Sequence, residues 1–483
     1  MSKPTPQTKV SRYFKLGRDQ TTLDFVDVPI GHDLPVFLDP SRLRTMTSDW
    51  ASECNSLLQH FFETLLAHLR NNEEAAGISM LAHLTEKNEF HFGLSKGLSD
   101  GRAFGDGYAH KIWEAIKNSK AGVSGLLVDL EDTCLFIEGI GPDRISDAVC
   151  NIVRGPLIRY TQDMCTYYGI PLVENVDSGP IWNPLTETWE NALVSLPLTP
   201  YGKLLLVPKL AVRQQLVYDY ASYFTHHLLP AMQASEKKLN TGLVHTLKDG
   251  RKRVTKKSLL EKYGATKLTV VEQTLRHPDA LAEYRQSAQK MSRPISHQRL
   301  ADIENIPRPN FEALLAAVAS VLPGREAAGE YEDAIEKLLS ALFFPSLSSP
   351  VKQHKIHDGR KRVDITYVNN PAEGFFKWLL SHYPSSHIFV ECKNYGKEVG
   401  NPEIDQLAGR FSPSRGQVGI LVCRTVEKAQ KLKDSCKDTA NDKRGYIITL
   451  TDDELGELVK DYASTDGGAG FPLLMKKFRD LIM

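Results

Sequence analysis

The sequence predicts an α/β protein whose N-terminal region is mainly helical with mixed α+β character and whose C-terminal domain layers helices on a mixed sheet. From Phe311 onward, short apolar runs typical of buried strands alternate with helical segments. Before that point, most apolar residues recur at three- and four-residue spacing. Two prolines within 306–310 forbid a continuous helix, so we expect a recruiting or sensing region over 1–305 and a second domain over 306–483.

Composition narrows the class of protein. Lys and Arg number 59 and so do Asp and Glu, so the formal net charge is zero and any contact with phosphate must be local. Hydrophobic residues make up 41% of the chain, enough for a large core. The chain has no run of about 18 apolar residues, and residues 1–10 are polar, so we expect a cytoplasmic protein without a membrane contact. Seven scattered cysteines without a C-x-x-C pair favour neither disulfides nor zinc.

The N-terminal region is expected to combine short extended segments with helices. Extended segments are predicted at 22–28, 34–38, 126–130, 134–137 and 204–207. Helices are predicted from Asp49 behind a Ser48 cap, and over 143–168 and 212–235. The Gly155-Pro156 pair should split the second of these helices, because proline lacks the N–H that a helix interior uses.

The C-terminal domain has a regular alternation of helical and strand-like segments. The expected helices cover 311–321, 330–343, 402–411, 426–438 and 452–462. The expected strands cover 362–368, 387–393, 418–423 and 446–450. An amphipathic stretch at 375–383 is inserted between the first two strands. This alternation predicts helices packed on a mixed sheet.

Acidic and basic residues interrupt two of these apolar strands at positions that packing alone would not select. Asp364 stands between Val363 and Ile365, and an apolar run precedes Glu391 and Lys393. Glu391 and Lys393 share one face because side chains alternate across a strand. Burying such charges costs free energy unless they pair or bind a metal. Two carboxylates from neighbouring strands offer hard oxygen ligands, which predicts Mg²⁺ (or Mn²⁺) rather than zinc.

Four short motifs occur in order along this domain. They are Gly-Glu-Tyr-Glu at 329–332, Arg-Val-Asp-Ile at 362–365, Val-Glu-Cys-Lys at 390–393 and Asp-Gln-Leu at 405–407. Together they resemble the PD-(D/E)XK nucleases, most closely the restriction-endonuclease-like branch related to Mrr enzymes. The resemblance covers roughly 311–450, less than a third of the chain. It implies an α-β-β-β-α-β core and a metal-dependent nuclease that hydrolyses phosphodiester bonds, in DNA in preference to RNA.

The resemblance also implies a role for each residue of the expected catalytic site. Asp364 and Glu391 resemble the metal-binding carboxylates. Lys393 resembles the catalytic lysine, which would hold the attacking water or offset charge in the transition state. Glu332 resembles a helical acidic residue that supports the metal or its water. Gln406 resembles the glutamine of the following helix that orients the site.

Two features depart from the family pattern. The stretch at 375–383 lengthens the gap between the two strands that carry the carboxylates, and a minimal core lacks it. The helical acid has three candidates, Glu330, Glu332 and Glu336. We select Glu332 because it follows the aromatic Tyr331. Ordinary solvated helix surface is the alternative for Glu332 and Gln406, as a surface salt bridge is for a Glu-x-Lys pair.

Two local clusters of basic residues are candidates for contact with a phosphate backbone. The first consists of Arg360, Lys361 and Arg362. It directly precedes Asp364, where it could lead nucleic acid towards the metal. The second, the basic segment at 237–267, carries ten Lys and Arg, against three acidic residues within 236–261. At its centre lie Arg251, Lys252, Arg253, Lys256 and Lys257. It could grip DNA or RNA without reading bases, and the alternative is a solvated loop and helix face.

Three other patterns are weaker. Residues 93–97, Gly-Leu-Ser-Lys-Gly, fit the G-x-S-x-G elbow of serine hydrolases, but the glycines at 101, 105 and 107 disfavour the helix that must follow. A flexible loop, or a ligand loop, is the preferred interpretation. No G-x-x-x-x-G-K-[ST] motif is present, so no NTPase is expected. Polar residues along 143–154 could line an interface or a sensing pocket, although a solvated helix face is preferred.

These observations lead to one expected function and one alternative. We expect an Mg²⁺-dependent nuclease with a place in restriction or anti-phage defence. Its expected partner is nucleic acid. Whether the protein also forms a homo-oligomer or binds a defence-system partner protein is left open. The alternative is a catalytically inactive nucleic-acid-binding scaffold built on a nuclease core. The two differ in whether Asp364, Glu391 and Lys393 converge.

Overall fold

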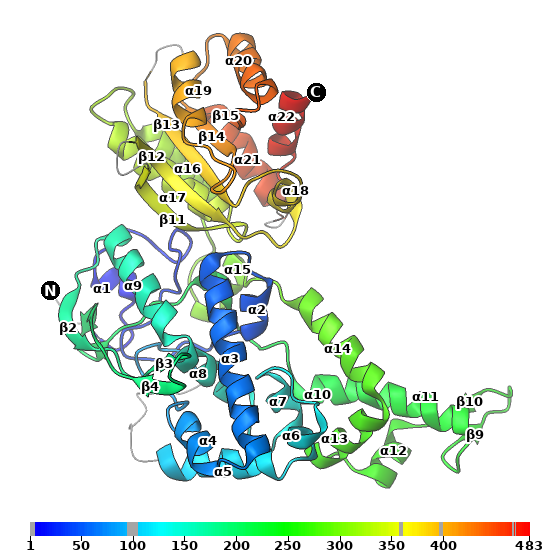
Figure 1. Ribbon diagram of the computed structural model, residues 1–483. Helices are drawn as coiled ribbons and strands as arrows, with labels where there is room; N and C mark the ends of the chain where they lie inside the picture. Colours follow the sequence, from blue (N-terminus) through cyan, green and yellow to red (C-terminus); the bar gives the residue numbers. More distant parts are fainter. Residues whose placement is uncertain (1–4, 94–104, 357–360, 396–398, 466–467, 469) are drawn as a thin grey trace.

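The computed structural model describes residues 5–93, 105–356, 361–395, 399–465, 468 and 470–483 (Figure 1). It is a mixed α/β structure, as the sequence predicts, with 51% of residues in helices and 15% in strands. Buried apolar side chains form two separate clusters. One gathers residues between Val10 and Leu300 together with Phe344, and the other gathers residues between Val318 and Leu481. Each half of the chain is thus built round a core of its own.

The N-terminal part consists mainly of helices. They are α1 (Val10–Tyr13), α2 (Pro40–Thr45), α3 (Asp49–Asn71), α4 (Glu74–Leu81), α5 (Gly105–Lys117), α6 (Lys120–Ser124), α7 (Asp132–Phe136), α8 (Pro142–Ile152), α9 (Arg154–Tyr168), α10 (Tyr220–Tyr223), α11 (Leu229–Leu239), α12 (Lys256–Tyr263), α13 (Lys267–Arg276), α14 (Pro278–Met291) and α15 (His297–Glu304), with a 3₁₀ turn η1 (Lys209–Ala211) and a π turn η2 (Phe224–Leu228). Ser48 caps α3 as predicted, because its side chain accepts the Ala51 N–H. Within the described ranges, we find no helix with the length and apolar character that a bilayer crossing requires.

The strands of this part form short antiparallel pairs. These are β1 (Phe37–Leu38) with β8 (Val212–Arg213), β2 (Val173–Asp177) with β5 (Leu193–Leu196), β3 (Ile181–Asn183) with β4 (Thr188–Glu190), β6 (Leu198–Thr199) with β7 (Gly202–Lys203), and β9 (His245–Thr246) with β10 (Lys252–Arg253). The predicted extended segments at 22–28 and 204–207 are buried, yet they form no named strands. A single bridge between Phe25 and Pro208 and the hydrogen bond from the Val26 N–H to Val207 O join them.

Three expectations for this part are wrong and one is confirmed. The expected extended segment at 126–130 forms no strand and leads into a turn. The segment at 134–137 lies mostly in α7, because Asp132 accepts the N–H groups of Val128 and Asp129 and so favours a turn over a strand. The expected helix at 212–235 begins only at Tyr220. The split within 143–168 is confirmed, but it falls at Val153, since Pro156 is tolerated in the first turn of α9.

The C-terminal part is built on one five-stranded sheet in the order β11–β12–β13–β14–β15 (Figure 1). The strands are β11 (Leu347–Ile356), β12 (Lys361–Asn369), β13 (His387–Lys393), β14 (Val418–Cys423) and β15 (Tyr446–Thr451). β12 pairs antiparallel with both β11 and β13, whereas β14 pairs parallel with both β13 and β15. The helices are α16 (Phe311–Ser320), α17 (Ala328–Leu342), α18 (Gly374–His382), α19 (Asn401–Ala408), α20 (Ala429–Asn441), α21 (Asp452–Ser464) and α22 (Pro472–Ile482).

The edge strand β11 of this sheet was not predicted from the sequence. Every residue of the inner strand β14 is buried, so its apolar run is easily recognised. β11 is instead polar along much of its length and contains Pro350. Pro350 lies where the pairing register shifts between Ser348 and Val351, a bulge at an edge where a missing N–H costs little.

Buried polar contacts join the two parts of the chain. Arg18 forms an ion pair with Glu336 of α17, whose side chain is fully buried. The Thr47 N–H donates to Asn370 Oδ1 over 2.9 Å. The first contact fixes α17 against the N-terminal part, and the second joins the N-terminal part to the residue that follows β12.

Candidate functional site

Asp364 and Glu391 come from adjacent antiparallel strands. Ile365 of β12 pairs with Val390 of β13, so the next step of the same register sets Asp364 opposite Glu391. The N–H of Cys392 donates to Asp364 Oδ2 over 2.8 Å, which fixes this carboxylate against β13. The sheet thus brings the two carboxylates together.

Glu391 is the most buried acidic side chain of this group, with 1% of its surface exposed. Its Oε1 accepts two hydrogen bonds, from Lys393 Nζ at 2.8 Å and from Gln406 Nε2 at 2.5 Å. Its Oε2 is buried and has no hydrogen-bond partner among the described residues. An unpartnered buried carboxylate oxygen is costly, and a cation beside it would remove that cost.

Glu332 reaches the same region from α17. Both of its carboxylate oxygens lie 3.0 Å from Gln353 Nε2, which donates to them from β11. Of the three candidates for the helical acid, Glu330 is exposed and Glu336 is bound to Arg18, so only Glu332 faces the sheet edge. Ligand atoms of Glu332, Asp364 and Glu391 are not, however, all within 4.8 Å of one another in the described chain.

Negative charge dominates the electrostatics of this group. Burial and the neighbouring charge of Asp364 raise the pKa of Glu391, although Lys393 lowers it in part. Burial likewise raises the pKa of Asp364, against the opposing effects of the Cys392 N–H and Lys393. Burial also raises the pKa of Glu332 to about 7, to which the charge of Asp364 contributes. Three carboxylates that each resist ionisation are typical of a site that holds a cation.

Two residues of this group were not predicted from the sequence. Gln353 is opposite Asp364 in the register of β11 and β12 and has a φ of +48°, uncommon for a residue other than glycine. Nothing in its strand context indicates this. Arg410 follows Gln406 by four residues and lowers the pKa of both Asp364 and Glu391. Arg410 lies two residues beyond the end of α19, so helical spacing does not place it at the site.

The two basic clusters lie in different places. Arg360 and the side chain of Lys361 are outside the described residues, whereas Arg362 is exposed on β12 with Nη1 3.5 Å from Gln353 Oε1. The basic segment covers the end of α11, the β9–β10 hairpin, α12 and the first residue of α13, and the hairpin lies at the end of an arm that projects away from the C-terminal sheet (Figure 1). Its central residues are all exposed: Arg251, Lys252, Arg253, Lys256 and Lys257.

The serine-hydrolase pattern falls largely outside the described residues. Gly93 is described and has a φ of +137°, a backbone conformation that favours glycine. Residues 94–97, with Ser95, are not among the described residues.

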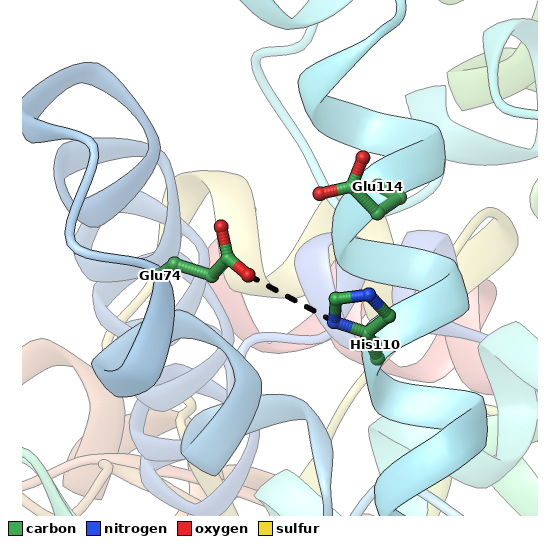
Figure 2. A group of neighbouring side chains, drawn as sticks. All are labelled: Glu74, His110 and Glu114. Carbon is green, nitrogen blue, oxygen red and sulfur yellow. Dashed lines mark ion pairs between the residues drawn. The ribbon is translucent and has the colours of Figure 1, made fainter.

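A group of possible metal ligands also lies on the N-terminal part (Figure 2). Glu74 of α4 and His110 and Glu114 of α5 bring one ligand atom each within 4.8 Å of one another, which no other trio of His, Cys, Asp or Glu does among the described residues. Lys117 Nζ lies 3.1 Å from Glu74 Oε2 and 3.8 Å from Glu114 Oε1. This lysine already balances the two carboxylates, and all the side chains are partly exposed. The group is therefore stable as a surface ion-pair network.

Comparison with known proteins gives one family match and one partial relative. A family model described as a domain of unknown function (DUF8370) matches residues 15–219 and ends before the C-terminal sheet. A protein of Escherichia coli (strain K12) named as a transposon gamma-delta 80.3 kDa protein is 26% identical over 140 residues, which are 28% of this chain and 20% of that protein. The chain thus matches about a fifth of the length of this relative. No solved structure matches the chain.

Proposed function

We propose that the C-terminal part is a metal-dependent nuclease with a PD-(D/E)XK-like, restriction-endonuclease-like core, and that it cleaves DNA in preference to RNA. The order α17–β11–β12–β13–α19–β14 supports this, because it follows the α-β-β-β-α-β order that the resemblance implies, with α18 inserted between β12 and β13. The separate cores support a division into a recruiting or sensing region and a nuclease domain near residue 306.

The observation that carries the proposal is the convergence on Glu391. Lys393 and Gln406 both donate to its Oε1, while Asp364 stands on the adjacent strand. These contacts join a carboxylate pair, a lysine and a helical glutamine that the sequence placed on three separate elements. A chance surface salt bridge would leave Glu391 exposed, yet it is 1% exposed.

The donor set fits a hard divalent cation. Asp364 and Glu391 would hold Mg²⁺ or Mn²⁺, and the unpartnered Glu391 Oε2 is the atom that such an ion would satisfy. When bound, the ion would polarise a phosphodiester oxygen and lower the pKa of a water. Because ligand atoms of the three carboxylates are not all within 4.8 Å of one another among the described residues, we assign Glu332 to the support of water.

The remaining groups position these residues. Gln406 and Lys393 hold the Glu391 carboxylate from two sides, and the Cys392 N–H holds Asp364. Lys393, with its side chain 12% exposed, keeps its ammonium at the site, where it can stabilise negative charge that develops on the phosphate. Gln353 links Glu332 to the sheet edge. The alternative, an inactive nucleic-acid-binding scaffold, is favoured by the wide spacing of the three carboxylates, whose ligand atoms are not all within 4.8 Å of one another among the described residues.

Metal dependence tests this proposal. Purified full-length protein is to be incubated with linear DNA, circular DNA and RNA in Mg²⁺, in Mn²⁺ and in EDTA. We expect cleavage with either metal, faster on DNA, and none in EDTA. Absence of cleavage under every condition would favour the scaffold, and cleavage that persists in EDTA would contradict a metal-dependent nuclease.

The basic segment gives a separate prediction about DNA binding. Lys252 and Arg253 are exposed, so replacing both with glutamine should weaken DNA binding without disturbing the core. We expect the slope of log affinity against log salt to fall by about 2, since each phosphate contact contributes about 0.9. Fluorescence anisotropy in EDTA measures this, with the exposed Lys460→Gln on α21 as control. An unchanged slope would show that the segment is only a solvated arm.

A further inference from the structure

Four carboxylates converge in the N-terminal part, away from the proposed nuclease site. They are Asp33, Glu86, Asp143 and Asp147, of which the last two lie one turn apart on α8. A methyl group placed on the Cα of Gly93 would stand 3.5 Å from Asp143 Oδ1 and 3.9 Å from Asp33 Oδ2. Two carboxylate oxygens thus face one space that Gly93, having no side chain, leaves open.

Two buried polar atoms at this space have no partner among the described residues. Asp33 is 6% exposed and its Oδ2 accepts no hydrogen bond, and His91 is 2% exposed with Nδ1 likewise unpartnered. His91 Nδ1 lies 4.0 Å from Asp33 Oδ1. Backbone bonds hold the two segments together, from the Leu34 N–H to His91 O at 2.9 Å and from the Gly93 N–H to Leu34 O at 3.1 Å. The unpartnered atoms therefore lie in a fixed frame.

Among the described residues, acidic side chains predominate in this group. Burial, with the charges of Glu86 and Asp143, raises the pKa of Asp33 to about 7. Burial and the same two charges, among others, raise the pKa of Asp147 to about 8. Arg144 on α8 offsets this only in part, because it donates to Gly139 O and lies over the Tyr108 ring.

We propose that this group binds a hydrated divalent cation of the Mg²⁺ type, with Asp33 and Asp143 as its direct ligands. Within the described residues, no three acidic or histidine ligand atoms of this group lie within 4.8 Å of one another. Mg²⁺ keeps several waters and is held by one or two carboxylates, whereas Ca²⁺ takes six to eight oxygens. The wide spacing of these ligands therefore favours Mg²⁺. Asp147 and Glu86 then bind through water. The site is independent of the proposed nuclease activity.

Mn²⁺ binding tests the proposal. Free Mn²⁺ is to be measured by electron paramagnetic resonance with the full chain carrying Asp364→Asn and Glu391→Gln, which removes the proposed nuclease ligands. We expect one bound Mn²⁺ to remain. Adding Asp33→Asn or Asp143→Asn should weaken its binding at least tenfold, whereas adding Glu74→Gln should leave it unchanged.

A second measurement guards against a folding defect. Asp143 is exposed, so Asp143→Asn should fold normally, and it should raise the unfolding temperature in EDTA because it removes a like charge. The same variant should lose the stabilisation that Mg²⁺ gives the parent. The proposal is overturned if the Asp364→Asn, Glu391→Gln chain binds no Mn²⁺. It is equally overturned if Glu74→Gln, rather than Asp33→Asn or Asp143→Asn, abolishes binding.

Discussion

Glu391→Gln is expected to lower Mg²⁺-supported DNA cleavage by about 1,000-fold or more, because the interaction of a metal with the reacting phosphate amounts to several kcal/mol. The substitution keeps the shape of the side chain but removes the charge that would hold the ion beside Asp364. It also leaves Lys393 without its buried counter-ion. Single-turnover rates with saturating protein measure the effect on the chemical step.

Lys393→Met is the companion variant, since it keeps the aliphatic stem and removes the ammonium. We expect a fall of about 100- to 1,000-fold, the range for loss of one group that stabilises transition-state charge. The exposed Glu457→Gln and Lys460→Met, both on α21 of the same part, are matched controls that should retain the parental rate. Parental rates in Glu391→Gln or Lys393→Met would remove these residues from the chemistry.

Arg18→Met is expected to destabilise the folded protein by about 3 to 5 kcal/mol, the usual effect of removing one partner from a buried ion pair. Glu336 is fully buried, so its charge would lose its principal partner. Burial alone lowers the pKa of Arg18, yet Glu336 raises it above its usual range, which indicates a strong pairing. Urea unfolding followed by circular dichroism measures the change, with each transition treated separately if two appear.

The exposed ion pair between Arg159 and Glu53 supplies the matched control for Arg18→Met. With side chains 55% and 48% exposed, this pair should contribute less than about 1 kcal/mol, so Arg159→Met should be almost neutral. Arg18→Met combined with Glu336→Leu should recover much of the loss, because no unpaired charge stays buried. If Arg18→Met is as mild as Arg159→Met, the contact does not fasten α17 to the N-terminal part.

Much of the C-terminal sheet could be predicted because its inner strands are buried on both faces. The apolar runs that became β13 and β14 leave strong local signals, and their ends were predicted without error. β11 gave no such signal, since an edge strand with Pro350 is polar. In the N-terminal part, the burial of 22–28 could be predicted but its hydrogen-bond partners could not, because they lie about 180 residues away near Pro208.

The contacts of the candidate site also divide into those that local sequence patterns predict and those that they do not. That Glu391 and Lys393 share a face follows from strand alternation alone, and their contact is local. The hydrogen bond from Gln406 was reached only through the resemblance, since periodicity cannot place a helix residue against a strand. The position of the Gln353 side chain depends on an unusual backbone conformation, and no feature of the sequence indicates that conformation. The contact of Arg18 with Glu336 joins residues 318 positions apart, beyond any local pattern.

The position of a bound metal ion shows directly whether Asp364 and Glu391 hold a divalent cation. Crystals of the full-length protein grown with Mn²⁺ are to be examined for anomalous scattering at the manganese edge. We expect an anomalous peak within about 2.5 Å of a carboxylate oxygen of both Asp364 and Glu391. A map that shows manganese elsewhere on the protein but no peak beside Glu391 would contradict this expectation.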